Sequence, residues 1–191
     1  MRLQGAFATV LVMAAVVLAV GVRPWIAESA EAPAASGSVS TALAVPAVPP
    51  GAFALTVLYV YDGDTIQAQI QAPNEIVTTS DPIRVRLIGV DTPEGTPTPE
   101  CWADDARRHL GAMLPEGSTV WAAPDRDTED DYGRRLFELW TDDGRFVASE
   151  LVSAGDAEAI RIRPNVTHHE LLAQLETEAR AAGRGRWGAC G

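Results

Sequence analysis

Three short runs of β-forming residues follow one another between Phe53 and Val90, and they restrict the fold more than any other part of the chain. The runs cover residues 53–61, 65–71 and 83–90. The first is rich in β-branched and aromatic residues, and the other two alternate apolar with polar residues, as half-buried strands do. The Asp62-Gly63-Asp64 turn joins the first two runs, and a loop over residues 73–82 joins the last two. Such a succession predicts a small barrel or a curled sheet.

The rest of the domain combines helices with strands. Apolar residues at helical spacing predict three helices, and further β-branched runs predict two more strands. The helices are expected over residues 100–114, 147–154 and 168–182, and the strands over residues 119–123 and 135–141. The sequence therefore predicts an α+β domain, mainly a β barrel, over residues 53–191.

The N-terminal region is typical of an exported protein. A nearly unbroken apolar run at residues 6–22 follows Arg2, so residues 1–27 are predicted to be a signal peptide or a signal anchor. The run is close to the minimum of about 20 residues for a spanning helix, so cleavage and anchoring both stay open. Residues 28–52 are rich in Ala, Pro and Ser, which predicts a flexible linker. We expect a secreted or cell-envelope protein that contacts a membrane only if residues 6–22 are retained.

Cys101 and Cys190 are the two cysteines of the chain. They are far apart and form no C-x-x-C pair, which argues against a zinc site. In an oxidising compartment they would form one disulfide that ties the C-terminal end to the middle of the domain. Otherwise they are two unrelated thiols. A disulfide across so long a loop would stabilise the domain by about 4 kcal/mol in the chain-entropy description.

Two aspartates stand at strand ends that a curled sheet can bring together. Asp64 closes the turn before the second strand, and Asp91 follows the third. Carboxylates placed together repel each other, and each prefers a proton unless a cation lies between them. A hard divalent ion with oxygen ligands removes this repulsion, and calcium suits a flexible, partly hydrated site.

Two arginines and a glutamate supply groups that suit phosphate chemistry. A guanidinium binds two phosphate oxygens and keeps its charge, so Arg86 and Arg134 would stabilise the charge that develops at phosphorus. Glu94 would orient or deprotonate an attacking water. Strict alternation places Arg86 and Asp91 on opposite faces, so the strand must end or bend before Asp91, and Gly89 permits this. Taken singly, each residue also fits a structural role in a turn, a cap or a surface ion pair.

Taken together and in order, three segments resemble the signature of the staphylococcal nuclease family. They are Asp62-Gly63-Asp64-Thr65, the run from Arg86 to Glu94, and Tyr132-Gly133-Arg134. The similarity extends to the Asp142-Asp143-Gly144 turn and the C-terminal helix, so it covers residues 53–190. The resemblance implies a five-stranded OB-fold barrel with about three α-helices. It also implies calcium-dependent hydrolysis of DNA and RNA to products with 3′-phosphate ends.

The resemblance assigns a role to each matching residue. The implied Ca²⁺ ligands are the carboxylates of Asp64 and Asp91 and the main-chain carbonyl of Thr92. The implied catalytic residues are Arg86, Glu94 and Arg134, and Tyr132 would contact the substrate. We expect a monomer that acts on DNA and RNA and prefers single-stranded or frayed substrates.

Two departures from the family pattern and the charge balance leave other functions open. Asp131 replaces a lysine before the Tyr132 motif, and Ile160 replaces a substrate-contacting tyrosine, so substrate affinity and nucleotide preference stay open. The net charge is −11, and all fifteen basic residues are arginine, which gives poor bulk attraction for nucleic acid. Binding must therefore depend on local arginines or a bound cation. The alternatives are a catalytically weak OB-fold module that binds nucleic acid or protein, and a non-enzymatic envelope domain.

Overall fold

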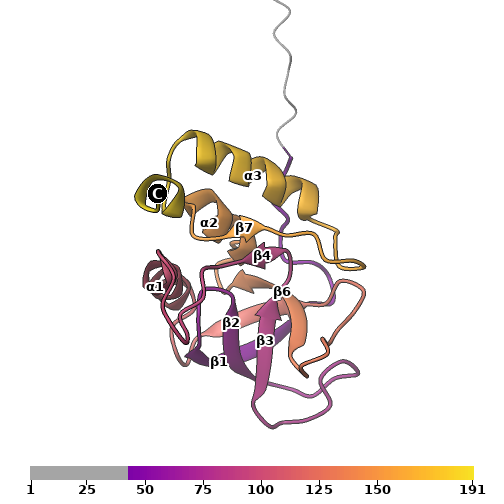
Figure 1. Ribbon diagram of the computed structural model, residues 1–191. Helices are drawn as coiled ribbons and strands as arrows, with labels where there is room; N and C mark the ends of the chain where they lie inside the picture. The colour runs from indigo at the N-terminus through magenta and orange to yellow at the C-terminus, as the bar shows by residue number, and fades with distance from the viewer. Residues whose placement is uncertain (1–42) are drawn as a thin grey trace, which may run out of the picture. The chain divides into compact units, whose positions relative to one another are not determined.

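A closed barrel of five strands forms the centre of the structure, which is a computed structural model that describes residues 43–191 (Figure 1). The strand order around the barrel is β1-β2-β3-β6-β5. The strands are β1 (Phe53–Val60), β2 (Thr65–Ile70), β3 (Ile83–Leu87), β5 (Thr119–Ala123) and β6 (Arg135–Thr141). Neighbouring strands are antiparallel except for β3 and β6, which run parallel. The predicted five-stranded barrel is confirmed.

A β-bulge in β1 decides which side chains face outward. Leu55 and Val57 are fully buried, so the first part of the strand points its odd-numbered residues inward. The pairing with β2 shifts register between Val57 and Tyr59. Beyond this extra residue Val60 is buried, and Tyr59 and Tyr61 face solvent. Bulges re-aim side chains in this way, and without the bulge both tyrosines would point into the barrel.

The predicted helices pack against the barrel at two places. They are α1 (Ala103–Met113), α2 (Val147–Ala154) and α3 (His169–Ala181), followed by the short α4 (Arg186–Ala189). In Figure 1, α1 lies beside the barrel, and α2 and α3 lie together at one end. The first helix begins later than the apolar spacing predicts, because Trp102 has a left-handed backbone with φ of 78°.

The third predicted strand divides into two pieces, so its extension to Val90 was wrong. β3 ends at Leu87, and a turn with Gly89 at φ of 81° leads into β4 (Val90–Asp91). β4 pairs with β7 (Glu158–Ala159) in a separate two-stranded sheet. The bend that the sequence requires before Asp91 is therefore present.

Part of the predicted linker packs against the domain. The carbonyl of Pro46 accepts a hydrogen bond of 2.9 Å from the indole N–H of Trp140, and Val48 packs on the hydrophobic core. The packed part of the chain therefore begins upstream of Phe53. The predicted signal segment at residues 1–27 and residues 28–42 of the predicted linker lie outside the described residues. Within residues 43–191, no helix is both long enough and apolar enough to cross a bilayer.

A disulfide and a buried carboxylate connect α1 to the C-terminal half of the domain. Cys101 and Cys190 form the predicted disulfide, which is confirmed. Next to Cys101, the indole N–H of Trp102 donates a 2.7 Å hydrogen bond to Asp156. Asp156 is 4% exposed, and its other oxygen contacts Nδ1 of His109. The α1 region is therefore linked covalently to the C-terminal end of the chain and by polar contacts to Asp156, in the segment after α2.

Two histidines with acidic partners make stability depend on pH. The hydrogen bond to Asp156 raises the pKa of His109, and the hydrogen bond to Glu138 raises the pKa of His168. A raised histidine pKa stabilises the fold fully below the unfolded value of about 6.5, and this stabilisation disappears as pH rises through the folded value. We expect the thermal unfolding midpoint to fall as pH rises above about 6.5.

The histidine variants separate this effect from other titrations. Replacing both His109 and His168 with glutamine should flatten the pH dependence of the unfolding midpoint. The variant His169→Gln should keep it, because His169 has no acidic partner among the described residues. An equally steep dependence in the double variant would contradict the assignment.

Candidate functional site

Asp64 is held rigidly at the entrance to β2. Its carboxylate oxygen Oδ2 accepts hydrogen bonds from the backbone N–H and the hydroxyl of Thr92, both at 2.9 Å. The other oxygen, Oδ1, accepts a 3.0 Å hydrogen bond from Thr65 and lies 3.2 Å from Nε of Arg86. The residue is 5% exposed, so these contacts fix its orientation.

The guanidinium of Arg86 lies between the two predicted metal-binding carboxylates. Its Nη2 is 2.7 Å from Oδ1 of Asp91, while its Nε faces Asp64. Its Nη1 donates hydrogen bonds to the carbonyls of Val90 at 2.6 Å and Leu87 at 3.1 Å. This contact is possible because the turn at Gly89 brings the chain back toward the end of β3. The structure thus brings Asp64, Asp91 and Arg86 together.

Negative charge is concentrated at this point. Burial, followed by repulsion from Asp64, raises the pKa of Asp62 to about 6. Partial burial also raises the pKa of Asp91, with smaller contributions from Asp64 and Glu158, against the opposing effect of Arg86. Carboxylates in this situation gain stability from a cation. Sequence reasoning treated Asp62 only as a turn residue, although its place two residues before Asp64 carried the signal.

Close packing at Gly63 fixes the turn that carries Asp62 and Asp64. A Cβ at Gly63 would lie 2.7 Å from Cγ2 of Thr92 and 2.8 Å from Cβ of Ala106. Contacts below 3.0 Å do not occur between real Cβ atoms, so only glycine fits. The turn is therefore pressed against both α1 and the residue that orients Asp64.

A second turn presents Arg134 and Tyr132. Asp130 accepts hydrogen bonds from the backbone N–H groups of Tyr132 at 3.0 Å and Arg134 at 2.9 Å, and from Nε of Arg134 at 2.7 Å. Burial disfavours the charge of Asp130, but these hydrogen bonds outweigh it and hold its pKa below the ordinary value. Asp130 was absent from the sequence predictions. The acceptor position two residues before Tyr132 was the available signal.

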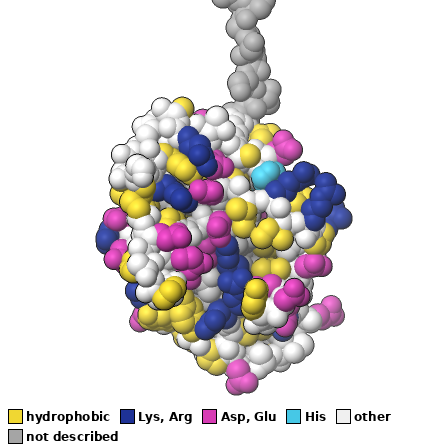
Figure 2. Space-filling model, viewed as in Figure 1, with side chains coloured by type: hydrophobic (Ala, Val, Ile, Leu, Met, Phe, Trp, Pro, Cys, Tyr) yellow, Lys and Arg dark blue, Asp and Glu magenta, His cyan; other side chains and the backbone are white. Residues whose placement is uncertain are grey.

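The remaining predicted residues line two cavities. One, of about 380 Å³, is lined by Glu94 and Arg134 together with Asp62. The other, of about 230 Å³, is lined by Arg86, Tyr132 and Arg134. Arg134 borders both, and Figure 2 shows arginine side chains in a band on the face that carries β2 and β3. Ile160 and Asp131, the two departures from the family pattern, line the second cavity.

Glu94 stands apart from the cluster around Arg86. It is exposed, and its backbone N–H donates a 3.0 Å hydrogen bond to Glu100. Its carboxylate forms no hydrogen bond or ion pair with the described residues. The structure therefore places Glu94 beside the same cavity as Arg134 without a direct contact between them.

The donor set for a metal is small. Among residues 43–191, no group of three or more His, Cys, Asp or Glu side chains converges as a metal site of that kind requires. The carboxylates of Asp64 and Asp91 lie on either side of Arg86, and the predicted third ligand, the main-chain carbonyl of Thr92, belongs to a residue that contacts Asp64 through its N–H and hydroxyl. Two carboxylates with a carbonyl suit a hard cation that keeps several water ligands.

Comparison with known proteins gives consistent matches. Residues 84–189 match the family model described as "Staphylococcal nuclease homologue". An uncharacterized endonuclease of Escherichia coli O157:H7 is 31% identical over 131 residues, which covers 69% of this chain and 74% of that protein. A thermonuclease of Staphylococcus intermedius is 33% identical over 127 residues, or 63% of this chain and 67% of that protein. Protein ParB of Escherichia coli is 31% identical over 139 residues, or 69% of this chain and 70% of that protein. The family match begins after Asp64 and includes the other predicted site residues.

Proposed function

Because this chain belongs to the staphylococcal nuclease family, we propose that it is a calcium-dependent nuclease that hydrolyses phosphodiester bonds in DNA and RNA. The products would end in 3′-phosphates. The observation that carries this proposal is the placement of Arg86 between Asp64 and Asp91, with Arg134 on the wall of the adjoining cavities. Arg86 joins the two carboxylates to a cavity that Arg134 also lines, which supports the proposal.

Ca²⁺ would be held by the carboxylates of Asp64 and Asp91 and the carbonyl of Thr92. When bound, it would supply electrostatic stabilisation of the charge on the phosphate. The fit rests on the raised pKa of Asp91 and the burial of Asp64, because both carboxylates lie where a cation lowers their repulsion. The two carboxylates would then depend less on Arg86, whose guanidinium would bind the phosphate.

Each of the proposed catalytic residues would have a separate role in the reaction. Glu94 takes a proton from water, and the water oxygen forms a bond to phosphorus. Arg86 and Arg134 bind the phosphate oxygens as their negative charge increases. The bond from phosphorus to the 5′-oxygen breaks, and that oxygen takes a proton from solvent. The other product retains the 3′-phosphate. Tyr132 would contact the substrate beside Arg134.

The proposed location is outside the cytoplasm. The Cys101–Cys190 disulfide favours an oxidising compartment. We propose a secreted or cell-envelope monomer in which residues 1–27 direct export, and residues 6–22 anchor the protein if they are retained. Residues 53–191 would form the nuclease domain, with the packed segment before Phe53 attached to it.

The net charge favours one alternative function. A charge of −11 disfavours bulk attraction to nucleic acid, and Asp131 places one of the negative charges beside Tyr132. A catalytically weak OB-fold module that binds nucleic acid or protein would be compatible with both features. Such a module would bind without cleaving, which the following assay detects.

A cleavage assay tests the proposal directly. We expect heat-denatured DNA to be cut in the presence of calcium and to stay intact when a chelator is added, because the two carboxylates then lack their cation. Product ends should resist polymerase extension until a phosphatase removes the 3′-phosphate. An intact substrate in calcium, or equal cleavage in chelator, would exclude the proposed activity.

A further inference from the structure

All three tyrosines of the chain are exposed, and each lies under an arginine. Tyr59, Tyr61 and Tyr132 are 40%, 36% and 86% exposed. The guanidinium carbons lie 5.5 Å from the Tyr59 ring for Arg107, 4.5 Å from the Tyr61 ring for Arg84, and 5.6 Å from the Tyr132 ring for Arg134. Tyrosines that serve only to fill a core would be buried, and here the bulge in β1 turns two of them outward.

The three pairs form a continuous band. The rings of Tyr59 and Tyr61 meet edge to face with centroids 5.0 Å apart. Arg84 and Arg134 line two cavities in common, one of which also contains Tyr132. We name this band the Arg–Tyr track, and its members are Tyr132, Arg134, Arg84, Tyr61, Tyr59 and Arg107. It runs from Tyr132 and Arg134, in the proposed active site, to Arg107 on α1.

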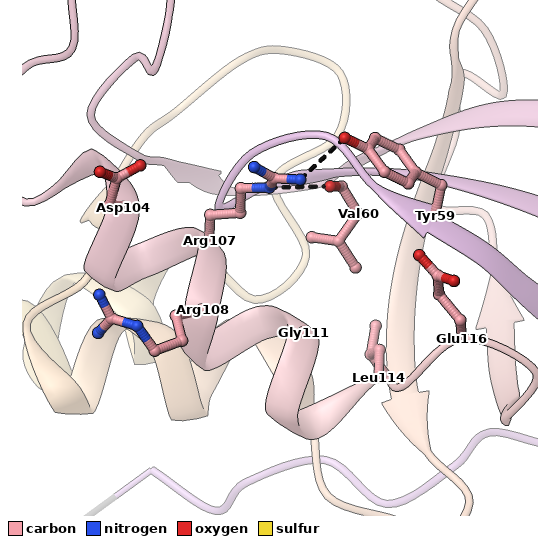
Figure 3. Close-up of a pocket in the computed structure, with 8 residues that line it drawn as sticks. All are labelled: Tyr59, Val60, Asp104, Arg107, Arg108, Gly111, Leu114 and Glu116. Atoms are coloured by element: carbon pink, nitrogen blue, oxygen red, sulfur yellow. Dashed lines mark hydrogen bonds between the residues drawn. The ribbon is translucent and has the colours of Figure 1, made fainter.

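The far end of the track is built from α1 and β1. Figure 3 shows Arg107 reaching from α1 to β1, where it donates hydrogen bonds to the carbonyl of Val60 at 3.1 Å and the hydroxyl of Tyr59 at 2.8 Å. Arg107 and Tyr59 border an open cavity of about 480 Å³. The track therefore continues into a hollow that the proposed reaction does not use.

Two arginines of the track carry uncompensated charge. Within residues 43–191, neither Arg84 nor Arg107 forms an ion pair, whereas Arg86 pairs with two aspartates and Arg134 with one. In a protein with a net charge of −11, unpaired guanidiniums beside exposed rings create a local site for phosphates. The same cavities are also lined by four acidic residues, which are Asp62, Glu94, Asp104 and Glu116. Phosphates should therefore bind on the side of each cavity that carries the arginines.

Arginines that alternate with exposed aromatic rings match the chemistry of a single nucleic-acid strand. Unpaired bases stack on aromatic side chains without regard to sequence, and guanidiniums bind the phosphates between them. A duplex hides the base faces and offers only its phosphates. A duplex therefore cannot use the tyrosine rings.

We propose that the Arg–Tyr track binds the single-stranded polynucleotide that continues from the cleaved phosphodiester. Bases stack on Tyr59 and Tyr61, and Arg84 and Arg107 bind phosphates. This assignment rests on the proposed nuclease function and names the form of substrate that the site takes. It also explains how an acidic protein holds a polyanion, since attraction is confined to one band.

The test compares a long with a minimal substrate. The double variant Arg84→Ala, Tyr61→Leu removes one guanidinium and one ring, and Arg84 forms no hydrogen bond through its side chain within residues 43–191. Binding of a labelled oligonucleotide of about twelve nucleotides is measured by fluorescence anisotropy in chelator, where cleavage stops. We expect its Kd to rise roughly tenfold or more. The slope of log affinity against log salt should weaken by about 0.7, as expected for loss of one phosphate contact with a single strand.

Kinetics in calcium locate the effect. For the same oligonucleotide, kcat/KM should fall at least about tenfold more than for a nitrophenyl ester of a mononucleotide, which lacks the polynucleotide chain that continues along the track. The control Arg145→Ala removes an equal charge from an arginine that pairs with Asp143 and Glu150 and lines none of the three cavities. It should change both values less than about twofold.

Each outcome separates the track from the nuclease function. If the natural protein cleaves DNA but the double variant binds the oligonucleotide as tightly as the natural protein does, the proposed binding role of the track is wrong. The proposed nuclease function is then unaffected. Equal losses on both substrates would also overturn the track, because they place the two residues in the reaction centre or the fold. If the natural protein binds the strand without cleaving it, while the double variant binds less well, the proposed function fails and the track stands.

Discussion

The variant Arg134→Ala is expected to cleave DNA at least about a hundredfold more slowly than the natural protein. Asp130 fixes the Arg134 guanidinium through Nε at 2.7 Å, and the arginine borders both the cavity lined by Arg86 and the cavity lined by Glu94. Its loss would remove a preorganised contact to phosphate oxygens whose charge grows during the reaction. Initial rates on heat-denatured DNA in calcium measure this effect.

Arg135 provides a matched control for that substitution. It is the next residue in the chain and pairs with Glu129 at 3.0 Å, and it lines neither cavity. Arg135→Ala should therefore retain most of the activity. Arg134→Lys should recover only part of it, because an ammonium lacks the planar fork of the guanidinium. If Arg134→Ala slowed cleavage less than about fivefold, Arg134 would not be a transition-state contact.

The variant Asp64→Asn should lose calcium-dependent cleavage almost completely. Loss of groups that merely orient metal ligands costs roughly 10–100-fold in metal affinity, so loss of a ligand charge should cost more than about a hundredfold. An amide group would also direct N–H donors toward either Thr92 or Arg86, which are themselves donors. The rate as a function of calcium concentration measures the loss.

Glu94→Gln distinguishes a metal ligand from a base. Glu94 is exposed, and its carboxylate forms no hydrogen bond or ion pair within the described residues, so this variant should fold normally. It should lose cleavage by about a hundredfold or more because the amide cannot accept the proton. Calcium affinity should stay close to that of the natural protein. If Glu94→Gln and Asp64→Asn lost calcium affinity equally, the two roles would not be separate.

Much of the architecture could be predicted from local sequence. The alternation in β2, the turn at Asp142-Asp143-Gly144 and the apolar face of α3 are properties of short segments, and the structure places these elements where the pattern indicates. The bend at Gly89 could be inferred because Arg86 and Asp91 cannot otherwise share one site. The pieces β7 and α4 were missed because two or four residues carry no usable periodicity.

Other features depend on tertiary structure. The run from Leu55 to Val60 is almost wholly apolar, so nothing in it marks the bulge that exposes Tyr59. The position of Arg86 between two aspartates is also not visible in the sequence, because it depends on the packing of β3 against β2 and on the turn that follows β3. Sequence motifs nominated the charged residues, but only the folded chain shows which pairs meet.

Calcium titration by calorimetry tests the central arrangement most directly. The natural protein and Glu94→Gln should each bind one ion with similar affinity, and Asp64→Asn should show no binding in the same range. Such a result would place the cation at the carboxylates beside Arg86. An absence of calcium binding by the natural protein, or unchanged binding by Asp64→Asn, would contradict it.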